Sequence, residues 1–99
     1  PPLSNPAATA LAHIGSDQAQ QTLTTFASQD TEIINNRVHA VAALEQNIQQ
    51  YKVLLTRAEI LKLYDLYNKS LASPQENIDV LSDILDAIES PTKTANSKP

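Results

Sequence analysis

Residues 34–58 have the sequence INNRVHAVAALEQNIQQYKVLLTRA, and the fold depends most on this stretch. From Val41 to Ala58 its main apolar residues follow one another at steps of three and four, which is the heptad spacing of a coiled coil. This spacing predicts a long amphipathic helix whose apolar side lies against another helix. We call the principal apolar residues the heptad stripe, namely Ile34, Val41, Leu44, Ile48, Tyr51 and Leu55.

The composition predicts an all-α fold. Hydrophobic residues make up 41% of the 99 residues, which is enough for a core, whereas aromatic residues make up 4%. The chain has one glycine and no Asn-Gly or Asp-Gly pair, so it lacks the turn residues that short β-hairpins favour. We therefore expect one all-α helical bundle or hairpin, with one long coiled-coil-like helix and flexible termini.

Helix signals at the N-terminus predict a short first helix. Asn5 followed by Pro6 is a typical helix start, and Gly15 stands where a helix end favours a left-handed residue. We therefore expect residues 1–15 to form an N-terminal arm with a short helix. Asp17, with a glutamine three residues later, predicts the next helix start.

The rest of the chain is expected to form one helical domain and a tail. Residues 16–90 make up the domain, whose last helix begins at Ser73-Pro74 with a clear capping pattern. Pro91 is expected to end that helix. Residues 91–99 are then a disordered tail or linker, because they are short, polar and poor in apolar residues.

Two positions leave the continuity of the long helix open. Near Asp30 the helix either breaks, with Asp30 or Thr31 capping a new helix, or continues with Asp30 and Arg37 as polar interruptions of its apolar side. We favour the continuous helix, because the apolar phase is kept and no glycine or proline intervenes. At Thr56 a capping box with Glu59 is the alternative sign of a kink or break.

The length of the predicted helix favours self-association. An unbroken helix from Thr31 to Leu55 would be about 37 Å long at 1.5 Å per residue. A compact domain of about 75 residues has a radius of gyration near 11 Å, so one end of that helix would expose its apolar side. We therefore expect a protein partner, most simply a second copy in a homodimer, with a heterologous helical partner as the alternative.

The segment that follows Thr56 is apolar around most of its circumference, which predicts burial on more than one side. Charge favours a hairpin between this segment and the last helix, because bases predominate in the first and acids in the second. The acids of the last helix recur at steps of three and four and form a possible docking face for a basic partner, or else a solvated face: Glu76, Asp79, Asp83 and Asp86.

Most kinds of chemistry have no residues to support them. The chain has no cysteine, and neither His13 nor His39 has a metal-ligating partner at helical spacing, so we expect no metal and no cofactor. No catalytic motif is present, so we expect that the protein is not an enzyme. A net charge of −4 argues against nucleic-acid binding, and no apolar run is long enough for membrane insertion.

The sequence therefore predicts a protein–protein interaction or oligomerisation module that acts through a long amphipathic helix. Two alternatives stay open. The first is an exported bacterial helical protein, such as a secretion-apparatus or appendage component, since the chain is rich in amides and hydroxyls and opens on proline rather than methionine. The second is a small bundle that binds an apolar ligand between residues 60–71 and residues 78–88.

Overall fold

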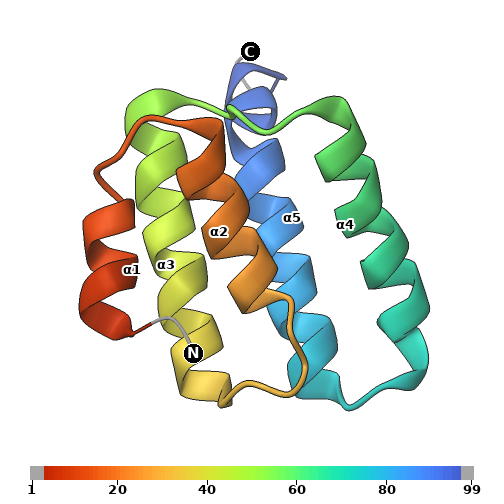
Figure 1. Ribbon diagram of the computed structural model, residues 1–99. Coiled ribbons are helices and arrows are strands. Elements are labelled where there is room, and N and C mark those ends of the chain that lie inside the picture. Colours follow the sequence, from red (N-terminus) through yellow and green to blue (C-terminus); the bar gives the residue numbers. More distant parts are fainter. Residues whose placement is uncertain (1–3, 97–99) are drawn as a thin grey trace.

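The computed structural model describes residues 4–96, with side chains as far as Ser90, and within this part every regular element is a helix. Figure 1 shows the helices running alternately up and down. In chain order the elements are α1 (Asn5–Leu11), α2 (Asp17–Ala27), α3 (Ile34–Tyr51), α4 (Arg57–Lys69), the 3-10 turn η1 (Ser70–Ala72) and α5 (Gln75–Asn96).

The all-α prediction is confirmed, but the long coiled-coil-like helix is not. The stretch expected to form it is divided among α2, α3 and α4, and α3 has 18 residues, or about 27 Å. A helix of that length fits inside a molecule of 39 × 31 × 23 Å. The last helix passes Pro91 and ends at Asn96, so the helix end predicted at Pro91 is wrong, and residues 97–99 of the predicted tail lie outside the described residues.

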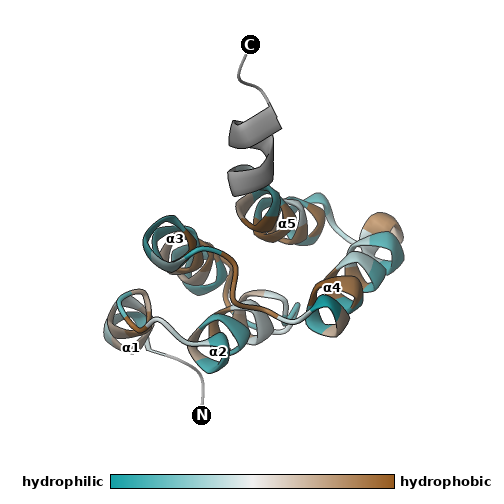
Figure 2. Ribbon diagram, turned by 90° about the horizontal axis from the view of Figure 1, so that it is seen from above, coloured by the Kyte–Doolittle hydropathy of each residue, from teal (hydrophilic) through white to brown (hydrophobic). Residues whose placement is uncertain are grey.

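The helices form two layers. Seen from above in Figure 2, α1, α3 and α5 lie in one row, and α2 and α4 lie in the other. The central helix α3 packs against α1, α2 and α5, whereas α4 packs mainly against α5 and η1. Residues of α3 such as Leu44 and Ile48 are fully buried and occupy the middle of the core. The chain is therefore a short stack of helical hairpins with α4 and α5 at one end.

Serine caps start the first two helices one residue earlier than the sequence predicted. The Ser4 hydroxyl accepts a hydrogen bond from the Ala7 amide at 3.2 Å, and the Ser16 hydroxyl accepts one from the Ala19 amide at 3.0 Å. Asn5 and Asp17 are instead the first helical residues. Because Pro6 still lies in the first turn, where its missing N–H costs nothing, the helix positions hold although the capping residues differ.

The chain breaks between α2 and α3, so the preferred continuous helix is wrong and the alternative of a break near Asp30 is correct. The residue at the cap position of α3 is Ile33, however, and not Asp30 or Thr31 as that alternative had it. The physical reason for the break is the side chain of Arg37, which is 3% exposed. Its Nε donates a hydrogen bond to the Ala27 carbonyl oxygen at 2.8 Å, at the end of α2. A carbonyl in a continuous helix would be bonded within the helix, whereas a terminal carbonyl needs such an outside donor.

The chain also breaks between α3 and α4, where the sequence offered a capping box. The Thr56 amide donates to Glu59 Oε1 at 2.7 Å, and the Glu59 amide donates to the Thr56 hydroxyl at 3.2 Å. Helix α3 ends at Lys52, which has φ 71° and ψ −176°, a backbone conformation that favours glycine. The break therefore combines the capping box at Thr56, which the sequence predicts, with a strained backbone at Lys52, for which the sequence gives no signal.

Gly15 does not adopt the left-handed conformation that the sequence predicted, because no glycine of the described chain has a positive φ. Its role is a close approach. A Cβ atom at this position would lie 2.6 Å from Cδ1 of Tyr51, which is closer than real contacts allow. The ring of Tyr51 is also held by its hydroxyl, which donates to the His13 carbonyl oxygen at 2.7 Å. Glycine is needed here for space.

The two halves of the chain repeat each other with a period of 40 residues. The capping residues Ser16 and Thr56 are 40 apart, and each accepts from the amide three positions on. In the other layer, six of the seven buried positions of α3 have a buried position of α5 40 residues later, and the exception is Ala43, whose counterpart Asp83 is exposed. The six pairs are Arg37 and Asn77, Ala40 and Val80, Val41 and Leu81, Leu44 and Ile84, Asn47 and Ala87, Ile48 and Ile88. Stacking of similar helical units is how repeat proteins build a continuous core.

Candidate functional site

The heptad stripe packs in the core of the single chain, and its expected role as an interface stays a prediction. Its members Val41, Leu44, Ile48 and Leu55 are buried, and Ile34 and Tyr51 are partly buried. The cover comes from the chain's own helices, since α3 packs against α1, α2 and α5. In this fold the heptad stripe is therefore covered largely by helices of the same chain.

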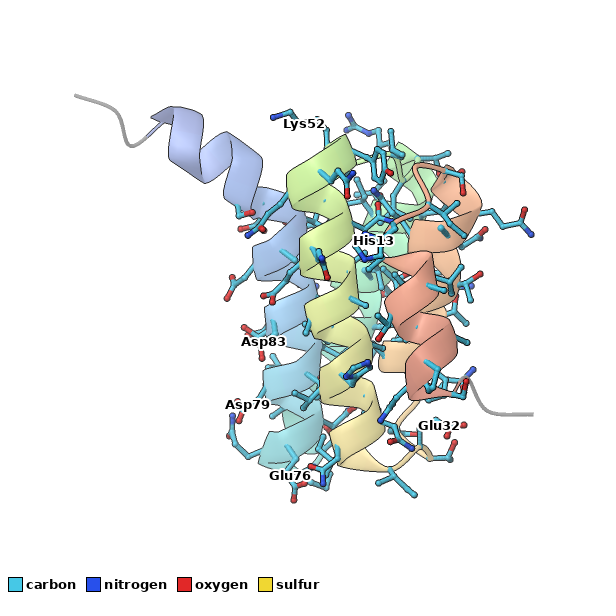
Figure 3. All side chains as sticks on the ribbon, turned by 90° about the vertical axis from the view of Figure 1, so that its left-hand side faces the viewer. His13, Glu32, Lys52, Glu76, Asp79 and Asp83 are labelled. Carbon is cyan, nitrogen blue, oxygen red and sulfur yellow. The ribbon has the colours of Figure 1, made fainter. Side chains whose placement is uncertain are left out.

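The acidic residues of α5 do lie on one exposed side. Figure 3 shows Glu76, Asp79 and Asp83 along the outer side of this helix, away from α1. Across the gap to α3, Glu45 is near this row. Partial desolvation raises the pKa of the Glu45 carboxyl, and the carboxylates of Asp83 and Asp86 raise it further. Desolvation and neighbouring carboxylates also raise the pKa of Asp83. These carboxylates therefore concentrate negative charge along one exposed side of α5.

A buried polar contact joins three elements near the first turns of α3 and α5. Besides its bond to Ala27, Arg37 donates from Nη2 to Asn77 Oδ1 of α5 at 2.6 Å. Burial lowers the pKa of Arg37, and the nearby carboxylate of Asp30 opposes that shift. Beside this contact lies an open cleft of about 440 Å³, lined by Asp30, Glu32, Ile34, Arg37, Pro74, Glu76 and Asn77. Since the guanidinium is already bonded, its first role is to join α2, α3 and α5.

A second buried polar contact was not predicted. Gln20 Nε2 donates to Asn47 Oδ1 and to the Lys52 carbonyl oxygen, both at 2.8 Å, and both amide side chains are fully buried. Asn47 Nδ2 donates in turn to the carbonyl oxygens of Leu11 and Ile14. These bonds hold the loop after α1 and the loop after α3 against α2. Sequence inspection gives no signal for them, because the chain has 31 amide or hydroxyl residues of similar type.

Helix α4 is covered on one side, whereas its composition predicted burial on more than one. Leu63 is its one buried residue, and Leu61 is 55% exposed. Tyr64, Asp65 and Asn68 share the side of Leu61 by helical spacing, and the exposed Leu71 of η1 follows at i+7 from Tyr64. We call this surface the end face, made of Leu61, Tyr64, Asp65, Asn68 and Leu71.

The 40-residue period relates the end face to the surface of α2 that lines a groove toward α4. A narrow groove between α2 and α4 is lined on the α2 side by Gln21, Thr24, Thr25 and Ser28, and on the α4 side by Glu59, Lys62, Leu63 and Leu66. Adding 40 to the α2 set gives Leu61, Tyr64, Asp65 and Asn68, which are the α4 members of the end face. The α2 counterpart is only partly covered, since Gln21 and Thr25 are exposed, and the end face differs from it in carrying a leucine and a tyrosine.

Hydrogen bonds and charges hold α4 against α5 beside the end face. The Tyr64 hydroxyl donates to the carboxylate of Glu89, and this bond raises the pKa of Tyr64. Lys69 and Asp65 form an ion pair of 2.9 Å within α4. The two helices do pack together as the charge pattern suggested. One contact between them joins a tyrosine to a carboxylate, and the acid–base pairs between these helices stay a prediction.

Other classes of site find no support in the described part of the chain. Residues 4–90 contain no group of three or more His, Cys, Asp or Glu side chains arranged to hold a metal ion. None of the helices within the described residues combines the length and hydropathy that a membrane span requires. No protein-family model, curated protein or solved structure matches this chain.

Proposed function

We propose that this chain is a protein–protein association module that binds a second copy of itself through the end face. The observation that carries the proposal is the position of Leu61. This side chain is 55% exposed on a helix that has one buried residue. A large apolar side chain exposed on a helix favours a helical partner.

The neighbours of Leu61 support the same proposal. Leu71 is 59% exposed, and Tyr64 between them is half-buried and keeps one edge toward solvent. Tyrosine and leucine presented together are typical of the centre of an interface, where they bury much area at small entropic cost. A chain of 99 residues also gains stability by burying such surface against another chain.

The proposal keeps the self-association predicted from the sequence and assigns it to a different surface of the molecule. The sequence placed self-association on the heptad stripe of α3, which the fold uses internally. The end face takes its place because α4 has one buried residue, whereas the members of the heptad stripe are buried or partly buried. The acidic face of α5 then borders the association surface and is not itself the dock.

The test is the solution mass of the protein, measured by light scattering over a concentration series. We expect the wild-type chain to approach twice 10.8 kDa as the concentration rises. Leu61→Glu should weaken the association by about 2 kcal/mol or more, which is roughly a 30-fold rise in Kd, because it places a charge at the centre of an apolar contact.

Val38→Glu is the matched control, because Val38 is 52% exposed on α3 and lies outside the end face. We expect this variant to associate like the wild type. The proposal is wrong if the wild-type chain stays at 10.8 kDa up to millimolar concentration, or if both variants change the mass to the same extent. Circular dichroism of each variant checks that the helices remain folded.

A further inference from the structure

The start of α4 is tied to the first turns of α2 by the side chain of Gln20. Gln20 Nε2 donates to the Lys52 carbonyl oxygen at 2.8 Å, and Gln20 Oε1 accepts from the Leu54 amide at 2.9 Å. Thr56, the cap of α4, follows two residues after Leu54. Figure 1 shows that α2 and α4 begin at the same end of the molecule. The fold therefore holds the beginnings of these two helices close to each other.

Each of these helix beginnings carries an acid, and the two acids meet. Asp17 is the first residue of α2, and Glu59 is the third residue of α4. Their carboxyl groups lie within hydrogen-bonding distance of each other. Two ionised carboxylates at such a distance repel each other, and neither has a proton to donate. A favourable contact between Asp17 and Glu59 therefore requires one proton on the pair.

The surroundings of the two carboxyl groups show which of them carries this proton. Glu59 Oε1 accepts from the Thr56 amide at 2.7 Å, a bond that favours the ionised form and lowers the pKa of Glu59. Asp17 Oδ1 is buried and has no hydrogen-bond partner in the described part of the chain. Partial desolvation raises the pKa of Asp17, and the hydrogen bond to Glu59 and the charge of Glu59 raise it further. Asp17 is therefore the donor and Glu59 the acceptor.

The other charges near this end of the molecule are placed to act only weakly on the pair. Asp17 is the only charged residue of α2, and α1 has none. Exposed side chains are screened by water and salt. The titratable groups of the remaining elements here are the exposed His13, Lys52, Arg57 and Lys62, together with Tyr51, whose hydroxyl is bonded to the His13 carbonyl oxygen, and Glu89 of α5, which is bonded to Tyr64.

We propose that Asp17 and Glu59 form a pH-sensitive contact between α2 and α4, which is closed when the pair holds one proton and is opened by repulsion when it holds none. The groove between the two helices, which Glu59 lines, then widens at this end. Because α4 packs mainly against α5 and η1, its first turns move away from α2 without unfolding of the core.

The direction of the pH dependence follows from the two carboxyl groups. The contribution of Asp17 to the contact is complete below the ordinary pKa of an aspartate, about 4, and is lost as the pH rises through the raised pKa of Asp17. The contribution of Glu59 is complete above the ordinary pKa of a glutamate and is lost as the pH falls through its lowered pKa. The contact is therefore strongest in the acidic range between these two pKa values.

Hydrogen exchange of the backbone amides, followed by mass spectrometry, tests the proposal. Asp17→Asn replaces the protonated carboxyl with an amide, which donates to Glu59 at any pH. At pH 7 we expect the amides of α4 to exchange about threefold more slowly in this variant than in the wild type, and those of α3 to exchange at an unchanged rate. Near pH 4 the two proteins should exchange alike. A low protein concentration keeps association from protecting α4.

The same substitution in a Glu59→Gln background is the matched control. Glutamine at this position still accepts from the Thr56 amide but carries no charge, so Asp17→Asn should not slow the exchange of α4 there. Equal slowing in both backgrounds would show that Asp17 does not act through Glu59 and would overturn the proposal. Equal exchange of Asp17→Asn and the wild type at pH 7, or the same slowing in α3 as in α4, would also overturn it. Circular dichroism confirms that each variant is folded.

Discussion

At the residue scale, the most informative position is Lys52, a non-glycine residue with φ 71° and ψ −176°. Conformations of this kind cost a lysine on the order of 1–3 kcal/mol. The conformation is held by neighbours on both sides, since the Lys52 amide donates to the Ile48 carbonyl oxygen and its own carbonyl oxygen accepts from Gln20. The chain therefore accepts strain at this turn in order to place α4 and the end face.

Replacement of Lys52 by glycine should relieve that strain. We expect Lys52→Gly to raise the free energy of unfolding by about 1 kcal/mol, after the greater flexibility of glycine in the unfolded chain is subtracted. Urea denaturation measures the difference. Lys52→Ala is the control, because it removes the amine but keeps Cβ and the strain. Equal midpoints for the glycine and alanine variants would show that the backbone at this residue is not strained.

At the element scale, the contact of α3 with α5 contains an unfavourable charge arrangement. Partial desolvation and the carboxylates of Asp83 and Asp86 raise the pKa of Glu45 above its usual value. The folded state therefore binds this proton more tightly than the unfolded state does. The consequence is a loss of stability at pH 7 that is relieved as the pH falls through the raised pKa.

Glu45→Gln should remove this penalty. We expect the variant to unfold at higher urea than the wild type at pH 7, and we expect the gap to close as the pH is lowered toward the ordinary pKa of a glutamate. Glu76→Gln is the control, because it removes one negative charge from the first turn of α5, where an acid favours the helix. If Glu45→Gln and Glu76→Gln shift stability in the same direction at pH 7, the repulsion between α3 and α5 is not significant.

At the scale of the whole molecule, folding and association are linked, because the surface proposed for association belongs to the same stack of helices as the core. Helix α5 repeats six of the seven buried positions of α3, whereas α4 has one buried residue and α2 has six. Binding of a second copy to the folded chain stabilises it by mass action. The melting temperature of the wild type should therefore rise by about 3 °C for each tenfold increase in concentration, as followed by circular dichroism.

The same scan on Leu61→Glu should give a melting temperature that does not change with concentration, because this variant is expected to stay monomeric. Val38→Glu should behave like the wild type in this respect. A wild-type melting temperature that is constant over a hundredfold range of concentration would contradict the link between folding and association.

The sequence by itself determined the helical class, the approximate places of the helices and the capping box at Thr56. These features are local, because caps and apolar spacing act within one or two turns. It also marked the residues of the heptad stripe as apolar and in phase, and they are buried or partly buried in the core. Local patterns cannot say which helix covers them, so the same spacing suited an interface and a core equally well.

The tertiary structure decided what depends on residues far apart in the chain. Arg37 reaches across a loop to Ala27 at the end of α2, and Gln20 bonds to Asn47 across 27 positions. Neither the break after α2 nor this buried pair of amides therefore has a signal in the local sequence. The 40-residue period was equally hidden, because its halves share burial rather than residue identity. The end face exists for the same reason: α4 is apolar by sequence, but only the packing of the other helices determines which of its sides is left uncovered.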